Sequence, residues 1–327
     1  MQSPIRKKLL EAFTNANGEF ISGQKLADIL NCSRTAVWKH IEELRNSGFE
    51  IEAVRRKGYR VVNKSEKVSE NEIQLGLQTK KFGQVIRYLE TVDSTQRAAV
   101  EFGQQGLPEG TLVIADEQTS GRGRLARSWH SPKHAGIWMS LILRPNVPPQ
   151  QAPQFTLITA VAVVQAIEEV CGIQADIKWP NDILIAGKKI TGILTEMQAE
   201  ADKINFIVIG IGMNVNQKEE DFPPELQEIA TSLAIQTGKR HSRAALVQTI
   251  LLKLEKYYEL YLEKGFTPIK LLWESYSNSI GKEITARTIT GSITGKALGI
   301  SETGVLKLRD NQGNIHDIYS ADIDIPE

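Results

Sequence analysis

Residues 116–129 read DEQTSGRGRLARSW and follow an apolar run, residues 112–115, that predicts a buried strand. The glycines let the backbone come close to a ligand, and Arg122, Arg124 and Arg127 fall within six positions. This combination is typical of a loop that holds an anion. It matches neither a dinucleotide fingerprint nor a phosphate-binding P-loop, and by itself it is also compatible with a flexible, solvated loop.

Two further clusters follow along the chain. Residues 178–182, KWPND, predict a strand that ends in a rigid turn, and residues 187–194, GKKITGIL, continue as a turn and a strand. A surface hairpin would explain this pair equally well. Residues 210–216, GIGMNVN, place two glycines in an apolar strand, where glycine weakens the strand unless a bulge or a ligand needs the space. We interpret these glycines as a site of close approach.

The elements predicted around these clusters are those of a mixed sheet with helices packed against it. Apolar and alternating runs predict strands at residues 85–89, 111–116, 136–143, 176–178, 183–185, 190–197 and 205–214. Helical spacing predicts helices near residues 94–102, 153–170 and 243–263. We expect these elements to form one catalytic unit, residues 66–279, after a polar connector.

The first 65 residues predict a winged helix-turn-helix. Helices are expected near residues 5–13, 23–30 and 34–46, where Ser22 and Ser33 are good N-caps and residues 17–18 and Gly48 end the flanking helices. Residues 49–62 predict a hairpin with a basic tip, and residues 1–63 hold eleven Lys/Arg against seven Asp/Glu. A helical protein-interaction domain is the alternative, but the basic hairpin favours DNA. The predicted DNA contacts are Ser33, Arg34, Thr35, Lys39, Arg55, Arg56 and Lys57.

The end of the chain predicts a small SH3-like barrel. Short alternating strands are expected at residues 283–288, 292–300, 305–309 and 315–319, with glycine and asparagine turns between them. The barrel either caps the catalytic unit or takes part in binding. The predicted fold class is therefore α+β and multidomain, with domains at residues 1–65, 66–279 and 280–327.

Length and composition agree with this division. A chain of 327 residues is about twice a typical domain of ~150 residues. Apolar residues make up 41% and charged residues 24%, which excludes a wholly disordered protein, and no apolar run approaches the ~20 residues of a membrane helix. The first ten residues lack the apolar stretch of a secretory signal, so we expect a cytoplasmic protein. Cys32 and Cys171 lack the spacing of a metal site or a disulfide.

Taken together and in this order, the GRGR loop, the KWPND turn with its K-x-x-G-I-L strand and the GIGxNxN strand resemble the biotin protein ligases. The winged helix places the chain with the bifunctional bacterial ligase/repressors, and residues 93–96, DSTQ, extend the similarity. One departure is Ala126, at a position where the family usually has glycine.

The resemblance implies that ATP activates biotin to biotinyl-5′-AMP, with Mg²⁺, and that biotin then passes to a lysine of a biotin carboxyl carrier domain. Cations must screen the approach of the carboxylate to the triphosphate. The implied catalytic residues are Arg124, Lys189 and Asp182, with Asp182 as a Mg²⁺ ligand or a proton acceptor. The implied biotin and adenylate contacts are Ser94, Thr95, Gln96, Gln118, Gly121, Arg122, Gly123, Arg124, Trp129, Lys189, Gly192 and Gly210.

The resemblance also implies regulation by the intermediate. Biotinyl-5′-AMP would order the arginine-rich loop and promote a homodimer, which presents two winged helices to a palindromic operator. Two alternatives stay open at this point: a lipoate or octanoate ligase on the same general fold, and a DNA-binding sensor with an inactive ligand domain. Biotin-dependent pyrophosphate exchange separates the three.

Overall fold

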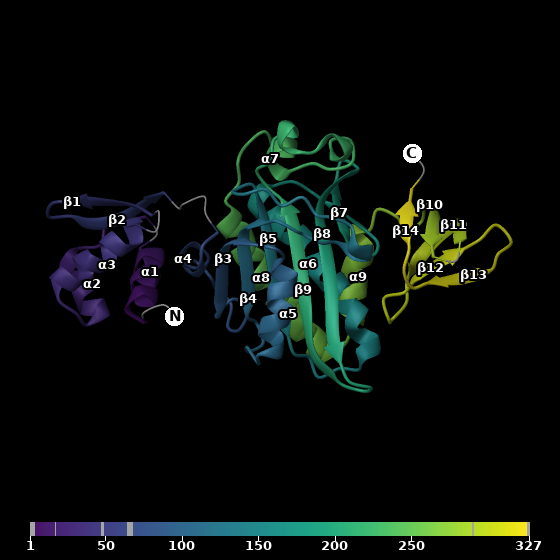
Figure 1. The fold of residues 1–327 in the computed structure, drawn as a ribbon, viewed down its shortest axis with the longest axis horizontal. Helices are drawn as coiled ribbons and strands as arrows, with labels where there is room; N and C mark the ends of the chain where they lie inside the picture. Colours follow the sequence, from purple (N-terminus) through teal and green to yellow (C-terminus); the bar gives the residue numbers. More distant parts are fainter. Residues whose placement is uncertain (1–3, 17, 47–48, 64–67, 290, 326–327) are drawn as a thin grey trace. The chain divides into compact units, whose positions relative to one another are not determined.

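The structure is a computed structural model that describes residues 4–16, 18–46, 49–63, 68–289 and 291–325 (Figure 1). The chain divides into two compact units. Unit 1 comprises residues 1–78 and 242–248, and unit 2 comprises residues 79–241 and 249–327. Each unit has a hydrophobic core of its own.

Unit 1 contains the helices and the hairpin predicted for the start of the chain. Its elements are α1 (Pro4–Asn15), α2 (Gly23–Leu30), α3 (Arg34–Asn46), β1 (Glu50–Val54), β2 (Gly58–Asn63) and α4 (Glu70–Gln74). Both predicted N-caps are confirmed: the Ser22 hydroxyl accepts from the Lys25 amide at 3.1 Å, and the Ser33 hydroxyl accepts from the Ala36 amide at 3.2 Å. The predicted helix ends at residue 17 and Gly48 lie outside the described residues.

The core of unit 1 explains its fold. Val37, Ile41 and Leu44 occupy one face of α3 and are completely buried, as their helical spacing predicts. Asn31 takes the left-handed backbone conformation, φ 49°, that turns the chain from α2 into α3. Arg34, Thr35, Trp38 and Lys39, on the remaining surface of α3, are exposed.

Unit 2 is built on a sheet of seven strands in the order β3-β4-β5-β9-β8-β7-β6. Only β3 and β4 run parallel, and every other neighbouring pair is antiparallel, which confirms the predicted mixed sheet. The strands are β3 (Ile86–Val92), β4 (Leu112–Gln118), β5 (Gly136–Leu143), β6 (Asp176–Lys178), β7 (Asp182–Ile185), β8 (Lys188–Ala199) and β9 (Ile204–Asn214).

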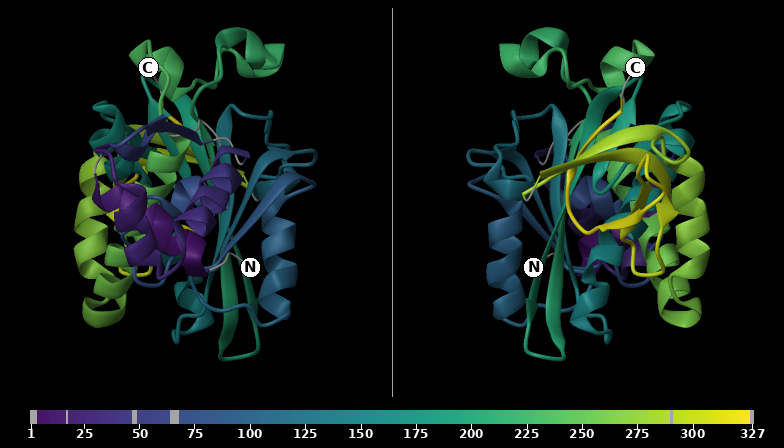
Figure 2. Two further views of the ribbon diagram at one scale, coloured as in Figure 1. Left: turned by 90° about the vertical axis from the view of Figure 1, so that its left-hand side faces the viewer. Right: turned by 90° about the vertical axis from the view of Figure 1, so that its right-hand side faces the viewer.

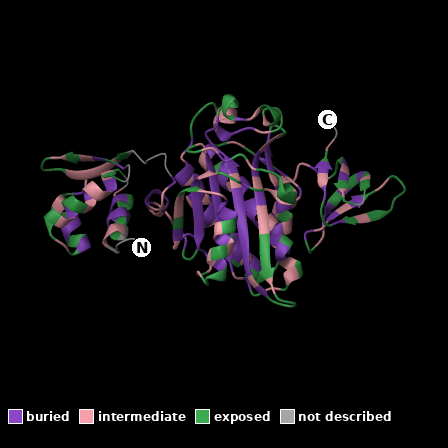
Figure 3. Ribbon diagram, viewed as in Figure 1, coloured by how far each residue is buried: buried purple, intermediate pink, exposed green. Residues whose placement is uncertain are grey.

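Helices cover this sheet on both faces. Figure 2 shows α5 on one face and α8 on the other, and Figure 3 shows the strands between them as largely buried. The α-helices are α5 (Thr95–Gln104), α6 (Ala152–Cys171), α7 (Leu233–Thr237), α8 (Arg243–Lys264) and α9 (Thr267–Tyr276). The 3₁₀ turns are η1 (Arg124–Ala126), η2 (Pro149–Gln151), η3 (Glu219–Asp221) and η4 (Pro224–Leu226). The sequence analysis missed α9, although proline in its first turn is a known start signal.

The helix α6 lies where it was predicted, but its apolar stretch is longer than the sequence analysis stated. Among the described residues, the segment Pro149–Cys171 is long and apolar enough to cross a membrane by composition alone. However, 72% of its most apolar window is buried inside the structure, and α6 packs on β6, β7, β8 and β9. The apolar side chains are therefore covered by protein, as in the core helix of a globular unit.

The last part of unit 2 is a small antiparallel sheet with the order β13-β12-β11-β10-β14. Its strands are β10 (Glu283–Thr288), β11 (Gly291–Ile300), β12 (Leu306–Arg309), β13 (Ile315–Ile318) and β14 (Asp322–Asp324). The predicted fold class, including a barrel-like end, is confirmed, and β14 is an additional strand. Hydrogen bonds join this sheet to the rest of the unit: Gln154 Nε2 donates to the Glu302 carbonyl at 2.8 Å, and Glu274 accepts from the Ile300 amide at 3.0 Å.

Candidate active site

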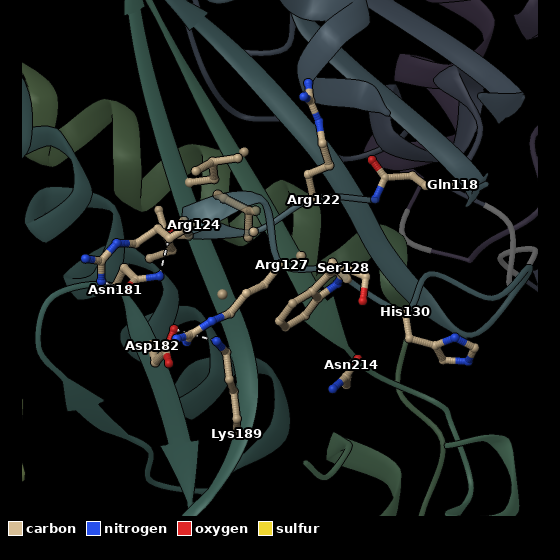
Figure 4. Close-up of a pocket in the computed structure, with 18 of the residues that line it drawn as sticks. Gln118, Arg122, Arg124, Arg127, Ser128, His130, Asn181, Asp182, Lys189 and Asn214 are labelled. Atoms are coloured by element: carbon tan, nitrogen blue, oxygen red, sulfur yellow. Dashed lines mark hydrogen bonds and ion pairs between the residues drawn. The ribbon is translucent and has the colours of Figure 1, made fainter. Parts of the chain in front are cut away.

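One pocket of unit 2 gathers residues from all three sequence clusters (Figure 4). It lies where α5 begins and where β4, β7, β8 and β9 meet the loop at residues 119–129. The predicted residues that line it are Ser94, Thr95, Gln96, Gln118, Arg122, Gly123, Arg124, Trp129, Asp182, Lys189, Gly192 and Gly210. Gly121 is not part of the lining; a side chain there would come within 2.5 Å of the Trp129 carbonyl.

One end of the pocket carries a buried polar network. Thr95 donates its amide to Gln118 Oε1 at 2.8 Å, and its hydroxyl lies 3.0 Å from Ser140 Oγ. Ser140 in turn donates to Gln96 Oε1 at 3.1 Å, and Gln118 Nε2 donates to Ser131 Oγ at 2.9 Å. Such a network can offer directed hydrogen bonds to a small polar ring inside an otherwise apolar site.

The glycines of β8 and β9 do provide a close approach, but the approaching groups belong to the chain itself. A Cβ at Gly212 would lie 2.5 Å from Nε1 of Trp129, and one at Gly192 would lie 2.9 Å from the same ring. A Cβ at Gly210 would lie 2.5 Å from Gln96 Oε1. These glycines therefore leave space for the Trp129 indole and the Gln96 amide, which line the pocket. The strand pattern alone did not reveal this reason for glycine.

The other end of the pocket is cationic. Lys189 Nζ lies 2.7 Å from Asp182 Oδ1 and 5.3 Å from the centroid of the Trp129 ring. Arg124 donates to Asn181 Oδ1 at 3.0 Å and to Ser320 Oγ at 2.7 Å. Burial lowers the pKa of Arg124, but a guanidinium stays charged at neutral pH. Arg124 and Lys189 can thus attract one anion together.

The arginine-rich loop makes a tight turn between these two ends. The Gly123 amide donates to the Arg127 carbonyl at 2.8 Å, and the Trp129 amide donates to the Gly121 carbonyl at 2.8 Å. Ala126 has φ 58°, in the left-handed region that favours glycine, so the departure noted in the sequence lies at a position where glycine would be relaxed. Figure 4 shows Arg122 directed away from Lys189, so the loop does not bring all its arginines to one point.

Several lining residues were missed by the sequence analysis. Phe222, Leu226, Ile229 and Ala230 lie over the pocket, in a segment without helical or strand periodicity. Backbone hydrogen bonds attach this segment to β8, because the Lys189 amide donates to the Ile229 carbonyl at 2.8 Å. Arg127 and Gly212, which the sequence analysis singled out without naming them as contacts, also line the pocket. Other missed residues are Ser128, His130, Met139, Ser140, Asn181, Ile193, Leu194, Ile211, Asn214 and Asp322. Ser140 had one signal, as the single polar residue of a fully buried strand.

Unit 1 has a hollow between the start of α3 and the hairpin tip. Of the predicted DNA contacts, Arg34, Thr35, Arg55 and Arg56 line it, whereas Ser33, Lys39 and Lys57 do not. Trp38 of α3 also lines the hollow and is 55% exposed. Arg34, Arg55 and Arg56 therefore lie around one hollow, and arginines are common contacts of the phosphate backbone in DNA-binding proteins.

Comparison with known families agrees with each part of the chain. Residues 5–60 match an HTH domain, residues 88–214 match the Biotin/lipoate A/B protein ligase family, and residues 279–325 match the Biotin protein ligase C terminal domain. The matches follow the same order as the predicted parts.

Whole-chain relatives agree with the family matches. The chain is 59% identical over 325 residues to the bifunctional ligase/repressor BirA of Bacillus subtilis, covering 99% of this chain and 100% of that one. It is 31% identical over 229 residues to a Paracoccus denitrificans biotin ligase named for acetyl-CoA carboxylase, covering 69% and 94%. The Aquifex aeolicus biotin protein ligase in complex with biotin and ATP aligns with a TM-score of 0.64 and 32% identity, covering 74% of this chain and 99% of that one. The chain therefore belongs to the biotin protein ligase family, among its bifunctional ligase/repressors.

Proposed function

We propose that this protein activates biotin with ATP and transfers it to a lysine of a biotin carboxyl carrier domain. One observation carries the proposal: a single pocket has a buried hydrogen-bonding network around Thr95 and Ser140 at one end and Arg124 with Lys189 at the other. Biotin has the matching shape, because its polar ring and its carboxylate are separated by an apolar chain.

In the first half-reaction, a carboxylate oxygen of biotin attacks the α-phosphorus of ATP. A new C–O–P linkage forms, the bond to the β-phosphate oxygen breaks, and pyrophosphate leaves. Arg124 and Lys189 neutralise the two anions that must approach each other, and a preorganised site does this without reorganising solvent. Trp129, seated on Gly192 and Gly212, supplies an apolar wall beside Lys189.

Magnesium would accompany ATP. The described residues contain no group of three or more His, Cys, Asp or Glu that could hold a metal ion by themselves. Magnesium bound through nucleotide phosphates needs only one or two protein carboxylates, and Asp182 supplies one at the cationic end of the pocket. When bound, the ion would help to neutralise the triphosphate.

In the second half-reaction, a neutral lysine amine of the carrier attacks the acyl carbon of the adenylate, and AMP leaves. The amine must lose a proton, and Asp182 is the proposed acceptor. Its carboxylate lies 2.7 Å from Lys189 Nζ, at the cationic end of the pocket where the acyl phosphate would form. By analogy with the relative named for it, the carrier would be that of acetyl-CoA carboxylase.

The second part of the function is repression. We place the DNA-binding domain at residues 1–65, the ligase at 66–279 and the C-terminal domain at 280–327, in a cytoplasmic protein. Arg34, Arg55 and Arg56 would contact the operator backbone. A homodimer formed with biotinyl-5′-AMP would bind two half-sites, which explains how the intermediate reports on biotin supply.

The decisive experiment incubates the full chain with ATP, Mg²⁺, biotin and a carrier domain, and detects biotin on the carrier by mass spectrometry. We expect one biotin per carrier lysine, and biotin-dependent exchange of pyrophosphate into ATP. A folded protein that exchanges pyrophosphate with lipoate and not with biotin would assign the pocket to the lipoate branch. If a folded protein exchanged pyrophosphate with neither biotin nor lipoate, the chain would be assigned as a DNA-binding sensor with an inactive ligand domain.

A further inference from the structure

The turn at the tip of the arginine-rich loop has little packing of its own. None of the η1 residues, Arg124–Ala126, is buried, and Leu125 is 68% exposed. Leu125 and Ala126 have φ of 54° and 58°, a backbone region that side-chain-bearing residues disfavour. Backbone hydrogen bonds from Gly123 to Arg127 and from Arg127 to Arg124 close the turn, and side-chain contacts from outside it add to them.

Those contacts come largely from the other end of the chain. Arg127 forms an ion pair with Asp322, and Arg124 donates to Ser320 Oγ at 2.7 Å. The third contact is the hydrogen bond of Arg124 to Asn181. Two of the three thus depend on β14 and the residues just before it, nearly 200 positions away in sequence.

The backbone around Asp322 is held by buried neighbours and by strand pairing. It lies between Ala321 and Ile323, both of which are buried, and Ile323 pairs with Ala286 of β10. The neighbouring β10 strand is hydrogen-bonded on both sides, to β11 and to β14. The backbone at Asp322 is therefore fixed by a folded sheet, and the residue lines the pocket together with Arg127.

The charges of Arg127 and Asp322 allow their contact to position the loop without keeping an anion out of the pocket. The hydrogen bond from Arg127 lowers the pKa of Asp322, so both groups are charged at neutral pH. Arg127 uses Nη2 for this contact, and a guanidinium carries five donors, so others can still face an anion in the pocket. The two side chains are 64% and 44% exposed, and an exposed ion pair adds little to global stability.

We propose that Asp322 is a positioning residue that anchors Arg127, and through it the arginine-rich loop, over the cationic end of the pocket. The C-terminal sheet thereby takes part in retaining the nucleotide intermediate and does more than cap the unit. This inference deepens the function proposed above, on which its ligand readout rests.

The chain offers a matched control in Asp324. It lies on the same strand, two residues further on, and it pairs with Arg287 at 2.5 Å with a side chain that is 49% exposed. Asp324 does not line the pocket. Asp322→Asn and Asp324→Asn therefore remove the same charge from the same small sheet, but only the first reaches the loop.

The experiment compares the full-length parent with both variants. Biotinyl-5′-AMP is formed in place, and its release is followed after a chase with unlabelled biotin. We expect release about two- to fivefold faster from Asp322→Asn, the factor that corresponds to one exposed ion pair, and parent-like release from Asp324→Asn. Unfolding temperatures should stay close to the parent's in both variants, and Asp322→Glu should restore part of the retention.

Two further measurements make the test independent of the ligand. In the ligand-free chain, trypsin should cut after Arg124 and Arg127 faster in Asp322→Asn than in either the parent or Asp324→Asn. Adding Asp322→Asn to Arg127→Gln should not accelerate release further, because both changes break one contact.

The inference is overturned if Asp322→Asn keeps the parent's tryptic pattern, if both variants change equally, or if the double variant shows additive effects. A parent that forms no biotinyl-5′-AMP would reject the proposed function instead, and the tryptic comparison would still decide whether Asp322 holds the loop.

Discussion

The ammonium group of Lys189 lies 2.7 Å from a carboxylate oxygen of Asp182. Asp182 begins β7 and Lys189 is the second residue of the neighbouring strand β8, and the pair lies at the cationic end of the pocket. The pair therefore brings a cation and a carboxylate together in one place in the free site. We expect the two residues to act in different half-reactions, Lys189 on the reacting anions and Asp182 on the proton of the attacking amine.

Variants of this pair should separate those roles. Lys189→Gln removes a cation that faces the reacting anions, so adenylate formation should fall about tenfold to a hundredfold. Asp182→Asn should slow the transfer of biotin from preformed adenylate by about 10²-fold or more, as expected for loss of a general base. Pyrophosphate exchange measures the first step and single-turnover transfer the second. An unchanged rate of transfer from preformed adenylate in Asp182→Asn would contradict its assignment as proton acceptor.

Arg124→Gly should make the adenylate leak. Losing one charge-assisted hydrogen bond should weaken retention about tenfold to a hundredfold. The fold should tolerate the change, because η1 has no buried residue. Equilibrium binding of biotinyl-5′-AMP measures the effect, with Arg309→Gly as the comparison, since that arginine is exposed and does not line the pocket. Arg124 is not the proposed contact if its variant binds the adenylate as tightly as the parent.

Two glycines should respond differently to alanine. A Cβ at Gly212 would clash with the Trp129 indole, so Gly212→Ala should displace the ring and weaken biotin binding even without ATP. A Cβ at Gly123 meets only the Arg127 carbonyl at 3.7 Å, an ordinary contact. Gly123→Ala should therefore fold normally and lose affinity only for the adenylate, where the backbone must approach the ligand. Calorimetric titration with biotin, and then with biotinyl-5′-AMP, distinguishes the two variants.

Operator binding should depend on unit 1 and on the ligand together. A single winged helix buries little surface, whereas a dimer doubles it, so biotin plus ATP should strengthen binding in the full chain. Arg34→Gln and Arg55→Gln should each weaken binding and lower the slope of log K against log salt by about 0.9. Lys264→Gln, at the end of α8, is the control for charge alone. Equal affinity with and without biotinyl-5′-AMP would reject ligand-coupled repression.

His241 should make stability sensitive to mild acid. Burial, and then the nearby charge of Lys239, lowers the pKa of His241, so between the folded and unfolded pKa values the unfolded state binds more protons. The free energy of unfolding should thus be fully maintained above about pH 6.5 and fall as the pH decreases below it. His241→Gln should flatten this dependence between pH 7.5 and 5.5 in urea titrations. An unchanged slope would assign the acid sensitivity to other groups.

Much of the fold was predictable from the sequence because its signals are local. The spacing of Val37, Ile41 and Leu44 predicted the buried face of α3, and Ser22 and Ser33 predicted the helix starts. The seven central strands were recognised because apolar runs bounded by turn residues need no distant partner to be seen. The three motifs also pointed to the residues that gather in the pocket, since their chemistry is carried by residue type.

The side-chain contacts within the pocket required the tertiary structure, because contacts between strands do not produce a periodic pattern in the sequence. Nothing in the strand pattern says that Gly212 seats Trp129, or that Ser140 joins Thr95 to Gln96. The lining segment near Phe222 is irregular, and β14 is too short and polar to stand out. The sequence by itself determined the elements and the chemistry available to them. Only the fold decided which side chains meet, because a contact such as that of Arg127 with Asp322 depends on how two distant strands pack.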